Sequence, residues 1–277
     1  MLDREEHIEQ AYLFKALLER GQQNVATQDL LQGLKEEVLA TSKLALAVDF
    51  LVGELKHAGI FSTAMVRMPH YFTPFQTFVI AEAEKERGRF DFGLALEILR
   101  REAEYRAAGA TRQGIFLYEF ESLSRNRLGY DYGLEAVAAD PIFDDAWRDW
   151  ITIVRRQVGF VDIADMVYVR SEYFLRVQRE RGHDGEPEVP VLFGEKEGRI
   201  ALANRRKDPL FLFAALNRQL GYPQVPRQKP VDESLQIIPT LVRRLERLET
   251  RIKLLEEEQK GGIDITKLYG KATLPPD

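Results

Sequence analysis

Glu54-Leu55-Lys56-His57 places a carboxylate and an imidazole three residues apart in a stretch with helical periodicity. Helix bundles that hold two iron or manganese ions use this Glu-x-x-His spacing, because residues three apart lie on neighbouring positions of a helix face. Glu54 and His57 are therefore the candidate metal ligands of this chain. A complete centre of this kind also needs a second pair and two more glutamates that point into the bundle.

The expected direction of these two side chains argues against a metal centre. The apolar stripe of the surrounding helix runs through Val48, Val52 and Leu55. At about 100° per residue, Glu54 lies about 120° from the centre of that stripe and His57 lies almost opposite it. We expect both side chains to point outward. A ferritin-like, metal-dependent oxidoreductase that uses Glu54 and His57 remains the alternative function.

A second candidate for chemistry is the basic run Arg205-Arg206-Lys207, which directly precedes Asp208-Pro209 at the start of an expected helix. The helix dipole does not favour cations at this end, so an anion could bridge the three side chains to the free amides. The alternative is a solvated basic turn that Asp208 balances.

Other catalytic patterns are missing from the chain. It has no cysteine, so it has no thiolate zinc site, cysteine nucleophile or disulfide. It also has no Gly-x-Ser-x-Gly, P-loop or His-Glu-x-x-His motif. We predict no catalytic residue and no cofactor, and a protein that is not an enzyme.

Charge and composition limit the classes of partner. The 277 residues carry a formal net charge of −5, which gives no general attraction to nucleic acid or to an anionic membrane. Nucleic acid is therefore an unlikely partner, although the arginine clusters at 155–156 and 176–181 leave an RNA- or ribosome-associated factor as a third function. The sequence shows no secretory signal or membrane span. We expect a cytoplasmic protein.

The strongest indication of a partner is a heptad pattern near the end of the chain. Apolar residues alternate spacings of four and three at Leu241, Leu245, Leu248, Ile252 and Leu255. In a parallel dimer, Arg244 would face Glu249 of the other copy and Arg251 would face Glu256, as expected for flanking positions of a coiled coil. The alternative is a single amphipathic helix that packs on its own protein.

A turn that occurs three times indicates the architecture. The segments 88–94 and 129–134 share an aromatic-Asp-aromatic-Gly-Leu core, and a looser copy follows at 159–164. In this turn glycine permits the reversal, the aromatic side chain can fill the space between two helices, and Asp can cap the second helix. We expect helix reversals at Gly88, Gly129 and Gly159, with Asp91, Asp131 and Asp162 as caps.

The turn resembles the pattern of tetratricopeptide repeats, in which Gly-x-aromatic-x-x-small-aliphatic joins the two helices of a pair. Gly88, Phe90, Gly93 and Leu94 match these positions in order. The resemblance covers residues 75–181 and implies stacked antiparallel helix pairs with a concave face that binds a peptide. The alternative is an irregular helical domain whose turns reuse one hairpin solution.

Helical caps and periodicity predict an all-α fold of stacked antiparallel helix pairs with a C-terminal coiled-coil helix. We expect N-terminal helices over 1–60, with one long helix from about Thr27 to His57, and the helical-pair array over 61–182. An irregular segment over 183–230 would contain a buried helix at 209–220 and a proline-rich linker. The coiled-coil helix and a mobile tail would occupy 231–277.

These observations favour one function. We expect a non-enzymatic scaffold that binds an unidentified protein on its helical array. It would self-associate as a parallel dimer through the C-terminal helix.

Overall fold

The computed structural model describes residues 2–21, 27–38, 42–85, 90–182 and 189–227, together with Leu248 and Ile252. The chain divides into two compact units, Met1–Gln228 and Lys229–Asp277. The helices described below belong to the first unit. The first three predicted segments, which span 1–230, therefore form essentially one unit.

The described residues confirm the all-α fold class with packed helix pairs, and they contain no strand. The thirteen helices of this part of the chain are α1 (Arg4–Gly21), α2 (Thr27–Glu37), α3 (Lys43–Ala58), α4 (Phe61–Val66), α5 (Pro74–Ala83), α6 (Phe92–Ala107), α7 (Arg112–Arg125), α8 (Tyr130–Ala138), α9 (Asp145–Gln157), α10 (Ile163–Val169), α11 (Glu172–Glu180), α12 (Glu195–Asn204) and α13 (Pro209–Leu220). None of these helices is long and apolar enough to span a bilayer.

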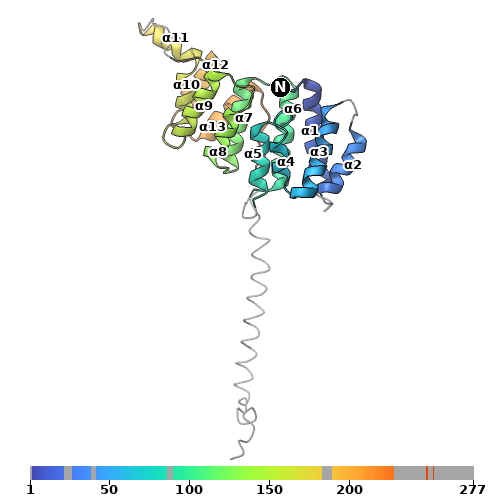
Figure 1. The fold of residues 1–277 in the computed structure, drawn as a ribbon. Helices are drawn as coiled ribbons and strands as arrows, with labels where there is room; N and C mark the ends of the chain where they lie inside the picture. Colours follow the sequence, from blue (N-terminus) through green and yellow to red (C-terminus); the bar gives the residue numbers. More distant parts are fainter. Residues whose placement is uncertain are drawn as a thin grey trace, which may run out of the picture. The chain divides into compact units, whose positions relative to one another are not determined.

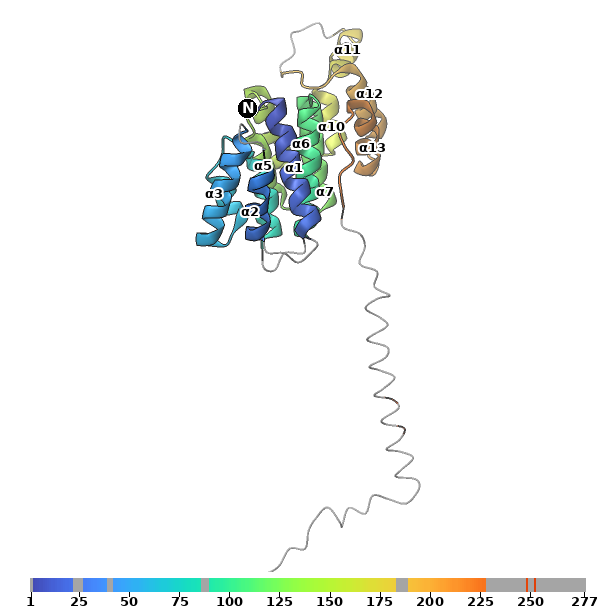
Figure 2. The same ribbon diagram turned by 90° about the vertical axis from the view of Figure 1, so that its right-hand side faces the viewer.

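The packing order of the helices departs from their order in the chain. Helix α1 packs most extensively against α6, so that α2 and α3 lie beyond α1 at one end of the array (Figures 1 and 2). Helix α12 packs against α10, and the helices α10 to α12 form the other end (Figure 1). One continuous apolar core runs through the unit.

Local capping signals predict several helix boundaries correctly. The Thr73 hydroxyl accepts a hydrogen bond from the Gln76 amide at 3.2 Å, and the Gln76 side chain accepts one from the Thr73 amide at 3.1 Å. This capping box starts α5, with Pro74 at the first helical position. Asp208 caps α13, and Gly221 ends it in the left-handed conformation with φ of 68°.

The prediction of one helix from Thr27 to His57 is wrong. Helix α2 ends at Glu37, and Ser42 is extended before α3 begins. The two helices pack against each other, and Lys35 pairs with Asp49 across them at 2.7 Å. A carboxylate oxygen of Glu6 in α1 accepts a hydrogen bond from the Lys43 amide at 2.8 Å, which helps to cap the start of α3. The apolar periodicity continues through the break because both helices bury it on the same core.

Two further boundaries differ from the expectation. The sequence pattern from Ile163 to about Arg181 predicts one last helix for the array, but the structure divides it into α10 and α11 at Arg170-Ser171. Helix α12 begins at Glu195, inside the segment expected to be irregular. In both places tertiary contacts decide the backbone, because the Leu192 amide and the Glu172 amide bond to the carbonyls of Arg170 and Phe193.

The repeated turn is confirmed in part. Asp91 and Asp162 cap the following helices, with amide-to-carboxylate distances of 2.8 Å and 2.9 Å. Gly159 has a φ of 90° between α9 and α10. The prediction for Asp131 is wrong, since α8 already starts at Tyr130 and the Asp131 carboxylate pairs with Arg155 instead. Gly88 lies outside the described residues.

A glycine after the second turn permits a close contact between helices. A Cβ atom at Gly133 in α8 would lie 2.6 Å from a methyl carbon of Leu123 in α7. Glycine at this position therefore lets α7 and α8 approach closely. The matching position Gly93 is less tight, because its nearest neighbour on another helix, Leu18, would be 3.4 Å away.

The region after α12 also differs from the expectation of a fully buried helix followed by a linker. In α13, Phe213 is buried, but Phe211 is 62% exposed. Residues 221–227 are not a free linker, since they pack back on the array. The Tyr222 hydroxyl donates to a buried Glu121 oxygen at 2.9 Å, and Arg101 donates to the Gln224 carbonyl at 2.7 Å.

Most of the predicted coiled coil lies outside the described residues. This holds for Leu241, Arg244, Leu245, Glu249, Arg251, Leu255 and Glu256, and for the tail from 261 to 277. Leu248 and Ile252 are described, and both have helical backbone and side chains that are about half exposed, at 51% and 53%.

Candidate functional site

The centre of the array contains a buried cluster of charges around Arg106. The guanidinium lies in the last turn of α6, where the helix dipole favours a cation. It donates to Glu102 at 2.7 Å, to Glu119 of α7 at 3.0 Å and to Asp140, after α8, at 2.6 Å. None of the four side chains is more than 5% exposed. One arginine therefore joins three segments of the chain.

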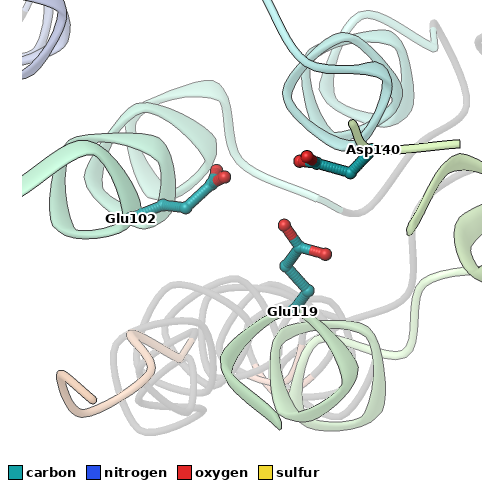
Figure 3. Close-up of side chains that lie close together, drawn as sticks. All are labelled: Glu102, Glu119 and Asp140. Carbon is teal, nitrogen blue, oxygen red and sulfur yellow. The ribbon is translucent and has the colours of Figure 1, made fainter. Parts of the chain in front are cut away.

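The three carboxyl groups point toward one another (Figure 3). One oxygen from each lies within 4.8 Å of the others, and among the described residues this is the only group of three or more such side chains that could hold a metal ion. Arg106 already binds one oxygen of each carboxyl group, so its guanidinium supplies the cation of this cluster. If all four groups were ionised, the net charge would be −2, from three carboxylates and one guanidinium.

Burial changes the protonation of the cluster. Loss of hydration raises the pKa of Glu119 well above its ordinary value, and the neighbouring Glu102 raises it further. Burial also raises the pKa of Glu102. For Arg106, burial opposes the charge, but the three carboxyl groups offset it and hold the pKa above its ordinary value. The cluster therefore favours a proton on the glutamates and a permanent charge on the arginine.

Two carboxyl oxygens in the cluster, Oε2 of Glu102 and Oε2 of Glu119, have no hydrogen-bond partner among the described residues. His7 of α1 lies nearby, and burial together with the charge of Arg106 lowers its pKa to about 4. Because Glu102 and Glu119 have no exposed surface, they cannot contact a substrate in this conformation. The cluster joins three segments of the chain, and its two buried glutamates favour the protonated form.

The second candidate site is an open groove at the end of the array formed by α10, α11 and α12. It has a volume of about 560 Å³ and is lined by Asp165, Tyr168, Val169, Tyr173, Phe174, Val177, Arg181, Leu202 and Arg205. This volume falls within the range of about 300–1,000 Å³ that is common for ligand pockets. Three aromatic and three aliphatic side chains line the groove together with Asp165, Arg181 and Arg205, so its surface is about equally polar and apolar.

The start of α11 is fixed by tight local contacts. The Ser171 hydroxyl donates to the Tyr168 carbonyl at 2.6 Å and accepts from the Phe174 amide at 3.2 Å. A Cβ atom at Gly198 in α12 would lie only 2.2 Å from the Ser171 oxygen, so α12 needs glycine at this point. Helix α11 itself contributes no buried side chain to the core. It is held at its first turn, and its apolar side chains are only half-buried.

Two arginine side chains lie over aromatic rings that line the groove. Arg205 lies 5.7 Å from the ring centre of Tyr168 and pairs with Asp165. Arg176 lies 4.9 Å from the ring centre of Tyr173 and pairs with Glu195 at 2.7 Å. Such cation–π contacts restrict the position of the guanidinium groups. Arg181 makes no ion pair with any residue that the structure describes.

The candidate residues from the sequence lie in different places. Glu54 pairs with Arg67 at 2.5 Å, and His57 is exposed. Neither belongs to the group of possible metal ligands described above. Arg205 belongs to the groove, whereas Arg206 and Lys207 are exposed beside it.

The N-terminal end of α13, which follows this basic run, is already capped. Asp208 accepts a hydrogen bond from the Leu210 amide at 2.9 Å. The expected site for an anion at 205–207 therefore has fewer free donors than its sequence suggests, and anion binding there stays a prediction.

Sequence reasoning missed both the buried cluster and the groove. One signal for the cluster was Glu119 inside the apolar run 115–120, since a charge in such a run needs a buried partner. A signal for the groove was the spacing of Tyr173 and Val177 beside Arg176 in a short helix.

No protein-family model, curated protein or solved structure matches the chain.

Proposed function

We propose that this protein is a non-enzymatic, cytoplasmic scaffold that binds another protein on its helical array and self-associates through its C-terminal helix. The open groove between α10, α11 and α12 carries this proposal, because it combines an apolar surface with fixed polar groups at its edge. Exposed apolar side chains of this kind are typical of surfaces that bind another chain.

The buried cluster supports the same function because it fixes the centre of the array. Arg106 and the three carboxyl groups join α6, α7 and the segment after α8 without an exposed reactive group. A rigid centre suits a scaffold, since a preorganised surface loses less entropy when it binds a partner.

Photo-cross-linking tests the binding function. A photoreactive phenylalanine analogue is placed in the full chain at Val177 in the groove, and separately at Leu46 and Tyr132, which are 75% and 71% exposed elsewhere on the array. The proposal expects a discrete polypeptide adduct from at least one position after irradiation in the native cells. If none of the three positions yields a polypeptide adduct, the scaffold function is wrong.

Sedimentation of the full chain tests self-association. Leu248 and Ile252 occupy adjacent positions of the heptad pattern and expose about half of their side chains. We expect the wild-type chain to sediment as a dimer and the double variant Leu248→Asp, Ile252→Asp to sediment as a monomer. Leu46→Asp, on an exposed position of α3, is the matched control and should remain dimeric. A monomeric wild-type chain would exclude the dimer.

A further inference from the structure

The helical array ends at α11 with an apolar surface that its own helices do not cover. Helical arrays usually close their ends with polar faces, because an uncovered apolar face exposes the core. Here Tyr173, Phe174 and Val177 of α11 line the groove instead, opposite Leu202 of α12. Figure 1 shows α11 at the end of the array that lies farthest from α2. This end of the array is thus open.

The charge at the edge of the groove is unbalanced. Asp165 is the one acidic side chain in the lining, and it is paired with Arg205. Arg181 has no ionic partner among the described residues, and Arg206 and Lys207 follow Arg205 as exposed cations. An incoming carboxylate would therefore meet a positive charge that no described residue pairs with.

We propose that the groove binds an acidic segment of a protein partner, in which large apolar side chains stand next to aspartate or glutamate. The apolar side chains enter between α10, α11 and α12, and the carboxylates pair with Arg181 and with the free donors of Arg205. This inference rests on the proposed scaffold function and identifies its binding site and the chemistry of its partner.

A segment without carboxylates fits the groove less well. Covering Arg181 with apolar atoms alone would remove the water around its charge without supplying an ionic or hydrogen-bond partner, which costs free energy. A basic segment would add repulsion from Arg181 and Arg205. Arg205 is also held in place by Tyr168, so a carboxylate meets a guanidinium group that is already oriented.

Selection from a random peptide library tests the proposal. Peptides of about 16 residues, enough to cross one groove by helix-in-groove binding, are displayed and selected on the immobilised full chain. A parallel selection uses the full chain carrying Val177→Asp, which places a carboxylate on the groove wall. We expect the wild-type chain alone to enrich peptides with Asp or Glu beside Phe, Leu, Ile or Trp.

The enriched peptides are then measured by fluorescence polarisation. Arg181→Glu should weaken their binding about tenfold or more, because it turns an attraction into a repulsion. The charge-preserving variant Arg181→Lys should retain most of the affinity, and Tyr132→Ser, on α8 and outside the groove lining, should retain all of it.

Enrichment of basic peptides, equal enrichment by the Val177→Asp chain, or no enrichment would overturn the proposal. Circular dichroism of each variant separates loss of the groove from loss of the fold. A polypeptide adduct at Leu46 or Tyr132 with no peptide selected at the groove would leave the scaffold function in place and reject this site.

Discussion

The centre and the open end of the array differ in how their arginine side chains are paired. At the centre, Arg106 has three carboxyl partners and its side chain is only 5% exposed, so its ion pairs are all internal to the fold. At the end, Arg181 borders an apolar groove and has no ionic partner among the described residues. The contrast teaches that burial alone does not mark a functional site. An arginine whose partners are all internal indicates structure, whereas an unpaired one beside an apolar groove indicates binding.

The largest effect is expected at the centre. Arg106→Met leaves three buried carboxyl groups without their cation, and removal of one partner from such a network costs about 3–5 kcal/mol. Urea unfolding monitored by circular dichroism measures this loss. Arg100→Met on the same helix is the control, since its pairs with Glu97 and Glu104 are partly exposed and worth roughly 1 kcal/mol or less. Equal losses in both variants would remove the distinction between the two sites.

The next effect concerns the packing that holds the groove together. Gly198→Ala places a methyl group against the buried Ser171, and overpacking of this kind costs about 1–3 kcal/mol. Gly53→Ala in α3 has open space around its Cβ and should stabilise the protein by up to about 1 kcal/mol through helix propensity. Thermal unfolding of the two variants should therefore shift in opposite directions. A stabilised Gly198→Ala chain would mean that α12 does not press on α11.

The centre should also respond to pH. Glu119 holds its proton in the folded state above its ordinary pKa of 4.5 and loses it on unfolding. Higher pH therefore favours the unfolded state, and stability is lost as pH rises toward the folded pKa. His7 acts in the opposite sense, because its lowered pKa of about 4 makes the folded state less stable as pH falls from 6.5 toward 4.

Above pH 6.5 the contribution of His7 has ended, and that of Glu119 remains. We expect the free energy of unfolding to fall as the pH rises above 6.5, because folded Glu119 keeps a proton that the unfolded chain has released. Glu119→Gln should flatten this slope. Urea titrations at several pH values measure this pH dependence. An equal slope in the wild-type and Glu119→Gln chains would mean that a group other than Glu119 carries the proton.

The smallest effect on stability is expected in the groove. Val177→Asp changes a side chain on a helix that contributes nothing buried, so the free energy of unfolding should change by roughly 0.5 kcal/mol or less. The same variant should remove binding of the selected peptides. If Val177→Asp instead unfolds the chain, the wall of the groove belongs to the core and not to a binding surface.

Local features of the fold are predictable from the sequence, and long-range ones are not. Thr73 and Asp208 were recognisable as caps because each bonds to an amide two or three residues away. The break before Lys43 depends on the carboxylate of Glu6 in α1, which no local pattern contains. Asp131 has the spacing of a helix cap, but its carboxylate pairs with Arg155 instead.

The candidate sites could not be predicted from the sequence for the same reason, because they depend on long-range contacts. The cluster joins residues from 102 to 140 through one arginine, and only the packing of α6 against its neighbours brings them together. Of the groove lining, the sequence pointed to Arg205 as a candidate for binding an anion and to Arg181 within the arginine cluster at 176–181, but it did not bring the two together. The heptad pattern from Leu241 to Leu255 still awaits a measurement of the oligomeric state.

Hydrogen–deuterium exchange of the full chain, with and without a selected acidic peptide, tests the division between a structural centre and a binding end. The account predicts slower exchange on binding in α10 and α11 (163–180) and in α12 (195–204). Exchange at the segments that carry Glu102, Arg106, Glu119 and Asp140 should remain unchanged. Protection at the centre with none at α10 to α12 would contradict it.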